Sequence, residues 1–296
     1  MDYKSVIPSR QARFALLKAL SFVPDSLMLR IQYRIKMGFW PDLKHPRRFT
    51  EKIQLYKMRY RNTVLPSCVD KYAVRGYVSS KGLGDILIPL FGVYDDAAKI
   101  DFASLPEKFV AKTTDGGGGN NVVIVNDKST LDESTFKAQL NGWLGIKDIN
   151  AGREWAYTGM ERSRIVIEEM LEDPSEGQHG LVDYKFFCFN GKPFCLQVDS
   201  GRFDGHHQNY YDMDWKSLGV HCTYPEGEVT PMPENFGTMK KVAAVLSSDF
   251  PFVRVDLYNI GGVIRFGELT FYPSSGYGTF HPDSFDFTLG EQFTEY

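Results

Sequence analysis

Apolar residues spaced three to four apart predict helices over the first eighty residues, and shorter apolar runs predict strands over most of the remainder. Helices are expected over 12–22, 25–37, 50–58, 70–82 and 131–144, and from Pro233 onward. Strands are expected over 86–94, 109–112, 122–125, 164–171, 181–189, 193–198, 252–258 and 263–271. Residues 204–231 are rich in aromatics without a clear period, so they are expected to be irregular. This order predicts an α+β fold with mainly antiparallel sheets.

Three strand pairs are expected to form hairpins. Asn190 and Gly191 give the strongest short hairpin signal, and Asn259 to Gly262 separate the last two strands. The strands at 109–112 and 122–125 flank a loop that holds four consecutive glycines, Gly116 to Gly119. Such glycines cost folding entropy, so this loop must either approach something closely or move.

The glycine loop points to phosphate, because bare N–H groups converge on anions and the first strand ends in a lysine, Lys112. It is not a P-loop, since Asn120 and Asn121 follow where Gly-Lys-Ser/Thr is needed. It is not a dinucleotide fingerprint, since a strand follows rather than a helix. We interpret it as a flexible flap over nucleotide phosphates; a plain hairpin turn is the alternative.

The chain of 296 residues is 43% hydrophobic, which is enough for a large core in one domain or a few subdomains. No run approaches the ~20 apolar residues of a membrane span, and the first residues lack the apolar core of a signal peptide. We therefore expect a cytoplasmic protein. Its cysteines, Cys68, Cys188, Cys195 and Cys222, contain no Cys-x-x-Cys pair and are expected to be reduced thiols.

Charge is distributed unevenly, although the net charge is only −3. Residues 1–75 hold 16 Lys and Arg against 5 Asp and Glu, and the remainder holds 18 against 32. The N-terminal part is thus expected to face something anionic. An acidic polysaccharide, an anionic membrane surface or the acidic C-terminal part itself would serve. Nucleic acid is not expected, because no nucleic-acid-binding module is recognisable.

Several carboxylates lie in otherwise apolar strands. Asp256 and Glu268 fall on the two strands of the last hairpin, where they could hold Mg²⁺ beside phosphates. The alternative is a surface Asp and a salt-bridged Glu, with Arg254 or Arg265 as the partner. Asp183 and Lys185 share one face of another strand, where a surface pair is the alternative reading.

Seven segments, taken in order, resemble the ATP-grasp superfamily and in particular its TupA-like (teichuronopeptide biosynthesis) branch of ATP-grasp amidoligases. They are Phe49-Thr-Glu-Lys-Ile-Gln, Asp70-Lys-Tyr-Ala-Val-Arg, Leu105-Pro-x-x-Phe-Val-x-Lys112, Ile167-Glu-Glu-Met-Leu, Asp183-Tyr-Lys-Phe-Phe-Cys-Phe-Asn-Gly-Lys, Val253-Arg-Val-Asp-Leu-Tyr and Gly267-Glu-Leu-Thr-Phe-Tyr-Pro-Ser-Ser-Gly276.

The resemblance implies an α+β ATP-grasp fold, in which two α+β subdomains clamp ATP between antiparallel sheets. It implies four parts: a helical basic N-terminal region (1–65), the N-terminal part of ATP-grasp (66–100), a lid subdomain with the glycine flap (101–166), and a C-terminal catalytic subdomain (167–296).

The resemblance also implies residue roles. Contacts to the nucleotide phosphates would come from Lys71, Lys112 and the flap residues Gly116, Gly117, Gly118 and Gly119. Contacts to adenine and ribose would come from Glu168, Glu169, Met170, Leu171 and Asp183, with Lys185 beside them. Mg²⁺ would be held by Asp256, Glu268 and Thr270, and the catalytic residues would be Lys112 and Arg202. Thr270 departs from the family pattern, which often has Asn there, so the third metal ligand is in doubt.

The implied reaction is ATP-dependent carboxylate–amine ligation through an acyl phosphate. The implied substrates are a uronic-acid sugar or polysaccharide and an amino acid or amine, in a capsule, O-antigen or teichuronopeptide pathway. The basic N-terminal region could then contact the inner face of the membrane. Three alternatives remain: a glycosyltransferase using Asp212-Met-Asp214, a non-catalytic ATP-binding protein, and a sugar kinase. His206 and His207 lack a third spaced ligand for zinc, so a substrate contact or a polar loop is expected there.

Overall fold

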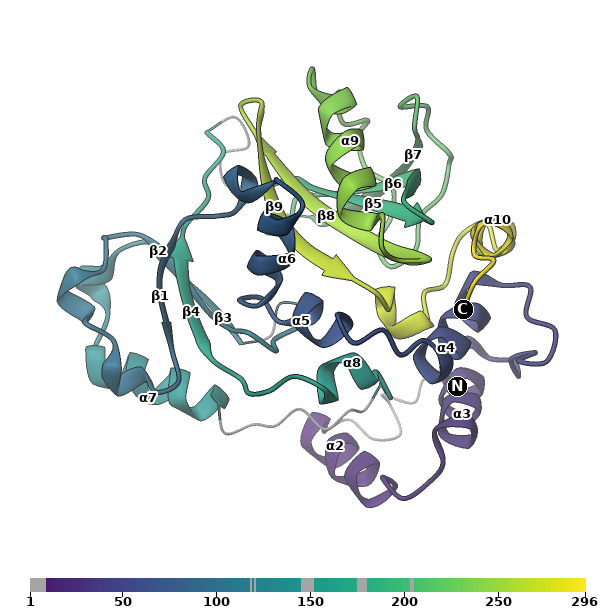
Figure 1. Cartoon of the computed structure of the whole chain (residues 1–296), viewed down its shortest axis with the longest axis horizontal. Coiled ribbons are helices and arrows are strands. Elements are labelled where there is room, and N and C mark those ends of the chain that lie inside the picture. Colours follow the sequence, from purple (N-terminus) through teal and green to yellow (C-terminus); the bar gives the residue numbers. More distant parts are fainter. Residues whose placement is uncertain (1–8, 118, 120, 145–151, 175–179, 203–204) are drawn as a thin grey trace.

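Two antiparallel sheets form the framework of the protein (Figure 1). The computed structural model describes residues 9–117, 119, 121–144, 152–174, 180–202 and 205–296. The first sheet has the order β1-β4-β2-β3, and the second has the order β7-β6-β5-β8-β9. The strands are β1 Leu90–Tyr94, β2 Phe109–Thr113, β3 Val122–Val125, β4 Ile165–Glu169, β5 Asp183–Phe189, β6 Lys192–Ser200, β7 His207–Asp212, β8 Phe252–Ile260 and β9 Val263–Thr270. The predicted α+β class with antiparallel sheets is confirmed.

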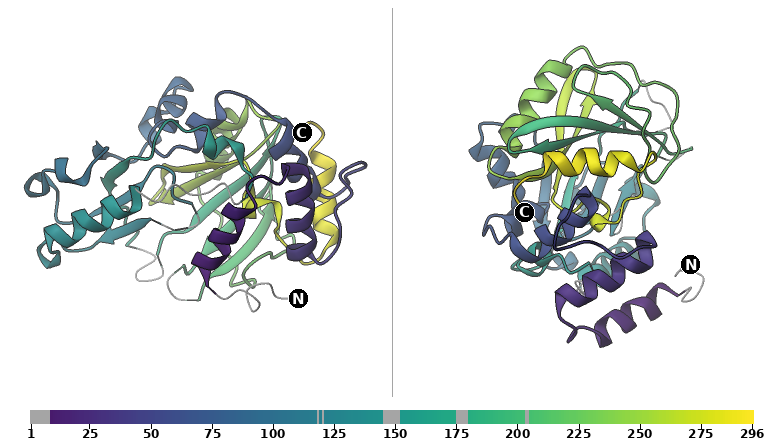
Figure 2. Two further views of the ribbon diagram at one scale, coloured as in Figure 1. Left: turned by 90° about the horizontal axis from the view of Figure 1, so that it is seen from below. Right: turned by 90° about the vertical axis from the view of Figure 1, so that its right-hand side faces the viewer.

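Helices lie around and between these sheets, and α2 and α3 stand outside both of them (Figure 2). The helices are α2 Arg10–Ala19, α3 Asp25–Met37, α4 Phe49–Arg59, α5 Leu65–Val69, α6 Val74–Ser80, α7 Glu133–Leu144, α8 Trp155–Thr158, α9 Phe236–Ser247 and α10 Ser284–Gln292. Within the described residues, no helix combines the length and the apolar character needed to cross a bilayer.

Each sheet has its own core. Phe136 and Leu140 of α7 pack against Phe109 and Ile167 of the first sheet. The second sheet contributes to a larger core, in which α9 covers one face. Its densest part is a cluster of buried aromatic rings with centroid distances of 4.9–6.2 Å, comprising Phe49, Phe187, Phe189, Phe252 and Phe293. Phe49 begins α4 in this cluster, so aromatic packing fixes that helix on the sheet.

The expectation of an irregular chain over 204–231 was wrong in part, because β7 pairs with β6 there. Its polar residues are buried and hold the following loop: Gln208 Oε1 accepts the Thr223 N–H at 3.0 Å, and Asn209 Oδ1 accepts the Gly227 N–H at 3.1 Å. Because these buried positions hold amide side chains, the alternation of apolar and polar residues by which a strand is recognised is missing from the sequence. The helix expected from Pro233 begins instead at Phe236.

The start of α4 is tied to α10 by buried polar contacts. The Thr50 N–H donates to Asp286 Oδ1 at 2.9 Å, and Thr50 Oγ1 donates to Asp286 Oδ2 at 2.7 Å. The two helices approach so closely that a Cβ at Gly290 would lie 2.1 Å from the Arg47 carbonyl oxygen. Glycine is therefore required at this crossing.

Lys57 of α4 is fully buried, with a side chain 0% exposed, beside the turn that follows β9. Its ammonium donates to Ser275 O at 2.7 Å, to Ser275 Oγ at 2.9 Å and to Gly152 O at 2.9 Å. Ser275 has a φ of 55°, in the left-handed region that costs a non-glycine residue energy. These hydrogen bonds from Lys57 thus stabilise the strained turn at Ser275. Burial lowers the pKa of Lys57 to about 8.

Gly290→Ala is expected to lower the free energy of unfolding by about 1–3 kcal/mol, because the new methyl group cannot avoid the backbone at Arg47. Gly142→Ala is the matched control, since Gly142 is likewise the third-last residue of its helix and its Cβ would meet nothing within 4 Å. Urea unfolding checks both variants. Equal stability of the two would contradict the close approach of α4 and α10.

Lys57 also gives stability a defined pH dependence. The pKa of Lys57 is about 8 in the folded protein against an ordinary 10.5, so the unfolded chain binds more protons between these values. Stability of the wild type relative to Lys57→Met is therefore expected to rise by about 3 kcal/mol from pH 8 to pH 10.5. Denaturant unfolding across this range measures the difference. Parallel pH curves for the two proteins would show that burial does not lower the pKa of Lys57.

Candidate active site

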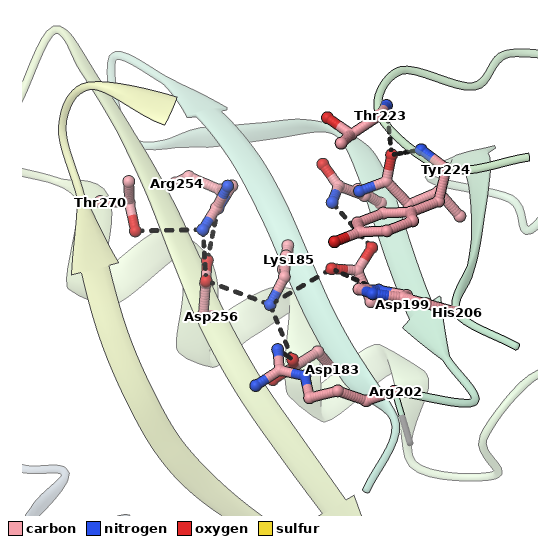
Figure 3. Close-up of polar contacts among 12 residues, drawn as sticks. Asp183, Lys185, Asp199, Arg202, His206, Thr223, Tyr224, Arg254, Asp256 and Thr270 are labelled. Atoms are coloured by element: carbon pink, nitrogen blue, oxygen red, sulfur yellow. Dashed lines mark hydrogen bonds and ion pairs between the residues drawn. The ribbon is translucent and has the colours of Figure 1, made fainter. Parts of the chain in front are cut away.

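Polar side chains form two rows on one face of the five-stranded sheet (Figure 3). Successive cross-strand partners make the first row, which is Gln197, Lys185, Asp256 and Glu268. Asp199 and Asp183 are partners in the next row. Opposed residues of antiparallel strands, and residues two apart on one strand, point to the same face. The strand register alone thus gathers these charges.

Lys185 is the centre of this face. Its ammonium lies 3.0 Å from Asp183 Oδ2, 3.4 Å from Asp256 Oδ2 and 3.8 Å from Asp199 Oδ2. Burial alone would lower the pKa of Lys185, but the three carboxylates outweigh burial and raise it. Lys185 is therefore a permanent cation at neutral pH.

Asp256, Glu268 and Thr270 adjoin one another, as the sequence predicted for a metal site. Thr270 Oγ1 donates to Glu268 Oε1 at 3.1 Å. Arg254 binds both oxygens of Asp256 at 2.7 Å, and its guanidinium lies 3.7 Å from Glu268 Oε1. The salt bridge that the sequence left open as an alternative is therefore present, with Arg254 as the partner.

The donor set fits Mg²⁺. Within the described residues, no three His, Cys, Asp or Glu side chains group to hold a metal. The candidate set named from the sequence is two carboxylates and one hydroxyl, which adjoin one another here. Mg²⁺ commonly takes one or two carboxylates and completes its shell with waters and substrate phosphates. Burial would raise the pKa of Glu268, but Lys71, Arg254 and Lys185 outweigh it and lower the pKa to about 2. Glu268 is ionised at neutral pH, and its side chain is 45% exposed.

Lys71 joins the two sheets. Its backbone N–H donates to Thr114 O at 3.0 Å, and its ammonium donates to Gly116 O, at the start of the glycine loop. The same ammonium lies 3.8 Å from Glu268 Oε2. Burial is the largest influence on the pKa of Lys71 and lowers it, with Lys112 acting in the same direction. The predicted phosphate flap and the predicted metal carboxylates thus meet at one lysine.

Lys112 lies on β2, and its ammonium contacts Glu168 of β4. Glu168 pairs with Val110, two residues before Lys112, so the two side chains share a face of the first sheet. Glu169 is the last residue of β4, and Met170 and Leu171 continue from it outside the strand with partly exposed side chains. Their role toward adenine stays a prediction.

The glycine loop connects β2 to β3, which pair as the predicted hairpin. Gly116 is buried, whereas Gly117 is exposed and a Cβ there would meet nothing within 4 Å. Gly119 has a φ of +77°, which favours glycine. Gly118 lies outside the described residues. Packing therefore does not demand a glycine at 117, which leaves approach to a ligand or movement as its reason.

Arg202 follows β6 and contacts Asp183, the predicted ribose acid. The Asp183 side chain is buried, and burial would raise its pKa, but Lys185 and Arg202 lower it. Asp183 is therefore ionised, and both of its cationic partners are residues that the sequence assigned to the site. The roles of Asp183 and Arg202 toward a nucleotide remain predictions.

Sequence reasoning missed Asp199 and Gln197, which extend the polar face onto β6. Gln197 Nε2 donates to Asp199 Oδ1 at 2.8 Å, and Gln197 Oε1 accepts the Tyr210 hydroxyl at 2.8 Å. A signal was present, because Gln197 and Asp199 alternate with apolar Leu196 and Val198 along the strand. Alternation of this kind marks one polar face.

A hollow of about 430 Å³ lies elsewhere, lined in part by Asn190, Pro251 and Tyr296. Asn190 follows β5, at the end opposite to Asp183. The hollow contains none of the residues assigned above, so the polar face remains the candidate site.

Solved structures similar to the chain include several ligases and a RimK domain ATP-grasp protein. A D-alanine–D-alanine ligase from Bacillus anthracis complexed with ATP is 18% identical, with 69% of this chain and 53% of that one covered and a TM-score of 0.40. An L-amino acid ligase from Bacillus licheniformis is 13% identical, with 86% and 55% covered and a TM-score of 0.45. A RimK domain ATP-grasp protein from Sphaerobacter thermophilus is 13% identical, with 77% and 69% covered and a TM-score of 0.43. The chain thus spans about half the length of the first two.

Among curated proteins, none matches the chain. The TupA-like ATP-grasp family model matches residues 51–294, which include every residue assigned to the site. The chain therefore belongs to the TupA-like ATP-grasp family.

Proposed function

We propose that the protein is an ATP-dependent carboxylate–amine ligase that forms an amide through an acyl phosphate. The observation that carries the proposal is the position of Lys71, between the glycine loop at Gly116 and the carboxylate of Glu268. A phosphate flap and a metal-binding pair are useful together only where a nucleotide phosphate lies between them. Membership of the ATP-grasp family supports the same reading.

The nucleotide would lie between the two sheets. Lys71 and Lys112 would neutralise its phosphates, and Glu168 to Leu171 would border the base. Asp183 would accept a hydrogen bond from the ribose. Lys112 is now paired with Glu168 and Asp183 with Lys185, so binding would exchange these internal ion pairs for contacts to ATP.

Asp256 and Glu268 would hold Mg²⁺, with Thr270 nearby. When bound, Mg²⁺ would supply positive charge to the transferring phosphoryl group. Lys112 and the glycine N–H groups would bind the remaining phosphate oxygens and exclude water from the site. Arg202, 45% exposed and held by Asp183, would face the acyl group and stabilise the oxyanion that forms on amine attack.

For the substrates, we propose a uronic-acid sugar as the carboxylate and an amino acid or other amine as the nucleophile. A carboxylate is a poor acyl donor at neutral pH, and phosphorylation by ATP gives it a good leaving group. The resemblance of the chain to the teichuronopeptide-biosynthesis branch of ATP-grasp amidoligases supports this choice. The pathway would be that of a capsule, O-antigen or teichuronopeptide.

The Asp212-Met-Asp214 motif, on which the glycosyltransferase alternative depends, forms part of a turn. Asp212 Oδ1 accepts the backbone N–H groups of Asp214 and Lys216, both at 2.9 Å, within a turn after β7. An aspartate used in this way closes the turn rather than offering a metal site. The ligase reading therefore explains more of the charged face of the sheet, with fewer assumptions than the transferase reading does.

Lys112→Ala is expected to lower ATP turnover by at least about 100-fold and to leave the fold intact, because one phosphate-binding cation is lost. Turnover is measured as ADP release in the presence of glucuronate or galacturonate and each of the common amino acids. Glu268→Ala is expected to act likewise, through loss of a metal ligand.

The matched control is Lys108→Ala. Lys108 also forms a lysine–glutamate pair, 2.8 Å from Glu172 Oε1, but on the surface. ATP turnover by Lys108→Ala is expected to stay within about twofold of the wild-type rate, since solvent-exposed ion pairs contribute little to stability. The proposed ligase would be contradicted if Lys112→Ala turned over ATP at the wild-type rate. It would also be contradicted if ADP release by the wild type depended on neither the uronate nor the amine.

We also propose that the N-terminal region binds an anionic membrane surface. Residues 9–48 hold nine Lys and Arg against two Asp, and large apolar side chains stand exposed among them, including Phe22 (81%) and Trp40 (62%). Basic charge beside exposed aromatic groups complements an anionic lipid interface. Such docking would hold the enzyme near a lipid-linked acceptor.

Wild-type protein is expected to sediment with phosphatidylglycerol vesicles and not with phosphatidylcholine vesicles. Replacing Phe22 and Trp40 by serine is expected to weaken binding by about tenfold or more, through loss of buried apolar area. Val229→Ser is the control, since it removes an equally exposed apolar side chain far along the chain. Equal binding to both lipids would contradict an electrostatic membrane site.

A further inference from the structure

His206 is a partly buried residue at the edge of the polar face, directly before β7, with its side chain 16% exposed. Its ring stacks on Tyr224 with a centroid distance of 3.7 Å and an interplanar angle of 23°. Its Nε2 atom is shielded from solvent and has no hydrogen-bond partner in the part of the chain that the structure describes. Buried polar atoms without partners are uncommon, so we expect a ligand to form a hydrogen bond with this nitrogen.

Nε2 faces the site rather than the core. It lies 3.6 Å from Asp199 Oδ2, beyond hydrogen-bond distance, while Asp199 Oδ1 is already bound by Gln197 (Figure 3). Lys185 connects Asp199 to Asp256 on the same face, through contacts of 3.8 Å and 3.4 Å. Two residues therefore separate His206 from the predicted metal ligand.

The reaction proposed above needs a proton acceptor at this place. An amine is an ammonium ion at neutral pH, and its nitrogen has no free electron pair until it loses a proton. Lys185 and Arg202 lower the pKa of Asp183, and Lys71, Arg254 and Lys185 lower the pKa of Glu268, so these two carboxylates are weak bases. Arg254 binds both oxygens of Asp256. A neutral imidazole is the side chain best suited to accept a proton near pH 7.

The surroundings keep His206 neutral before the amine arrives. Burial lowers the pKa of His206, and the charges of Arg202 and Lys185 act in the same direction, whereas Asp199 opposes them. Tyr224 contributes only its ring face. An imidazole with a lowered pKa has its lone pair available, and the nearby Asp199 carboxylate stabilises the imidazolium once it forms.

Resting on the proposed ligase activity, we propose that His206 Nε2 accepts the proton of the incoming ammonium group, with Asp199 beside it and Tyr224 fixing the ring. An ammonium that donates one N–H to Nε2 also approaches Asp199, because the two acceptors lie 3.6 Å apart. This pair therefore forms the subsite for the amine.

The step balances as follows. One N–H proton passes to Nε2, and the freed electron pair of the nitrogen forms the C–N bond. The bond between the acyl carbon and the phosphate oxygen breaks, and its electrons leave with phosphate. The second N–H proton is taken by the released phosphate, which departs as hydrogen phosphate. The products are the amide, hydrogen phosphate and an imidazolium at His206.

Hydroxylamine separates the base role from all other roles, because it is unprotonated at neutral pH and needs no base to attack an acyl phosphate. The experiment supplies ATP, Mg²⁺ and glucuronate or galacturonate, with either hydroxylamine or the common amino acids as nucleophile. His206→Gln is expected to lower amide formation at pH 7 by about 100-fold or more and to change hydroxamate formation by less than about threefold. Retained hydroxamate formation also shows that the variant is folded.

The pH profile gives a second readout. Wild-type kcat/KM for the amine is expected to rise with deprotonation of His206, below pH 7. In His206→Gln it is expected to rise only as the amine itself loses its proton, at higher pH. His207→Gln, the same change one residue later, is expected to resemble the wild type in both assays.

The outcomes separate the two proposals. Equal losses of amide and hydroxamate formation in His206→Gln, or no loss of either, would overturn the base role and leave the ligase reaction standing. A wild type that forms neither product with either uronate would overturn the ligase reaction, and the base role with it.

Discussion

The ammonium of Lys185 lies among three aspartates on a sheet whose other face is packed with aromatic and aliphatic side chains. Removing one member of such a buried group leaves an uncompensated charge, at a cost of about 3–5 kcal/mol. Each charge of the site is therefore compensated by neighbouring charges of opposite sign. Each ligand that binds there must replace a charge that the protein already supplies.

This constraint determines how the charged side chains of the site are paired. Arg254 occupies both oxygens of Asp256, Glu168 holds Lys112, and Lys71 lies against Glu268. A nucleotide with its metal carries both signs of charge, so it can take the place of each pair without leaving a partner unpaired. Binding would then be an exchange of ion pairs.

Features that depend on residues close together in the sequence were predictable. The glycine hairpin, the antiparallel pairing of Asp256 with Glu268 and the shared face of Asp183 and Lys185 follow from local alternation and turn residues. The meeting of Lys71 with Gly116 was not predictable in this way, because it depends on how two sheets pack. β7 was hidden because buried amides replace its apolar residues. Asp199 and His206 come together only through that strand's register.

The ties around α4 bear on how freely the N-terminal helices can be exchanged. The family match begins at residue 51, yet Tyr33 of α3 bonds Thr50, Thr50 bonds Asp286, and Asp25 pairs with Arg153. Lys57 then donates a hydrogen bond to Ser275, just beyond β9, the strand that holds the predicted metal ligand Glu268. A fragment cut at the start of the match would lose Thr50 and expose Asp286 without its partner. In recombination between relatives, the N-terminal helices and the turn after β9 would have to be inherited as one unit.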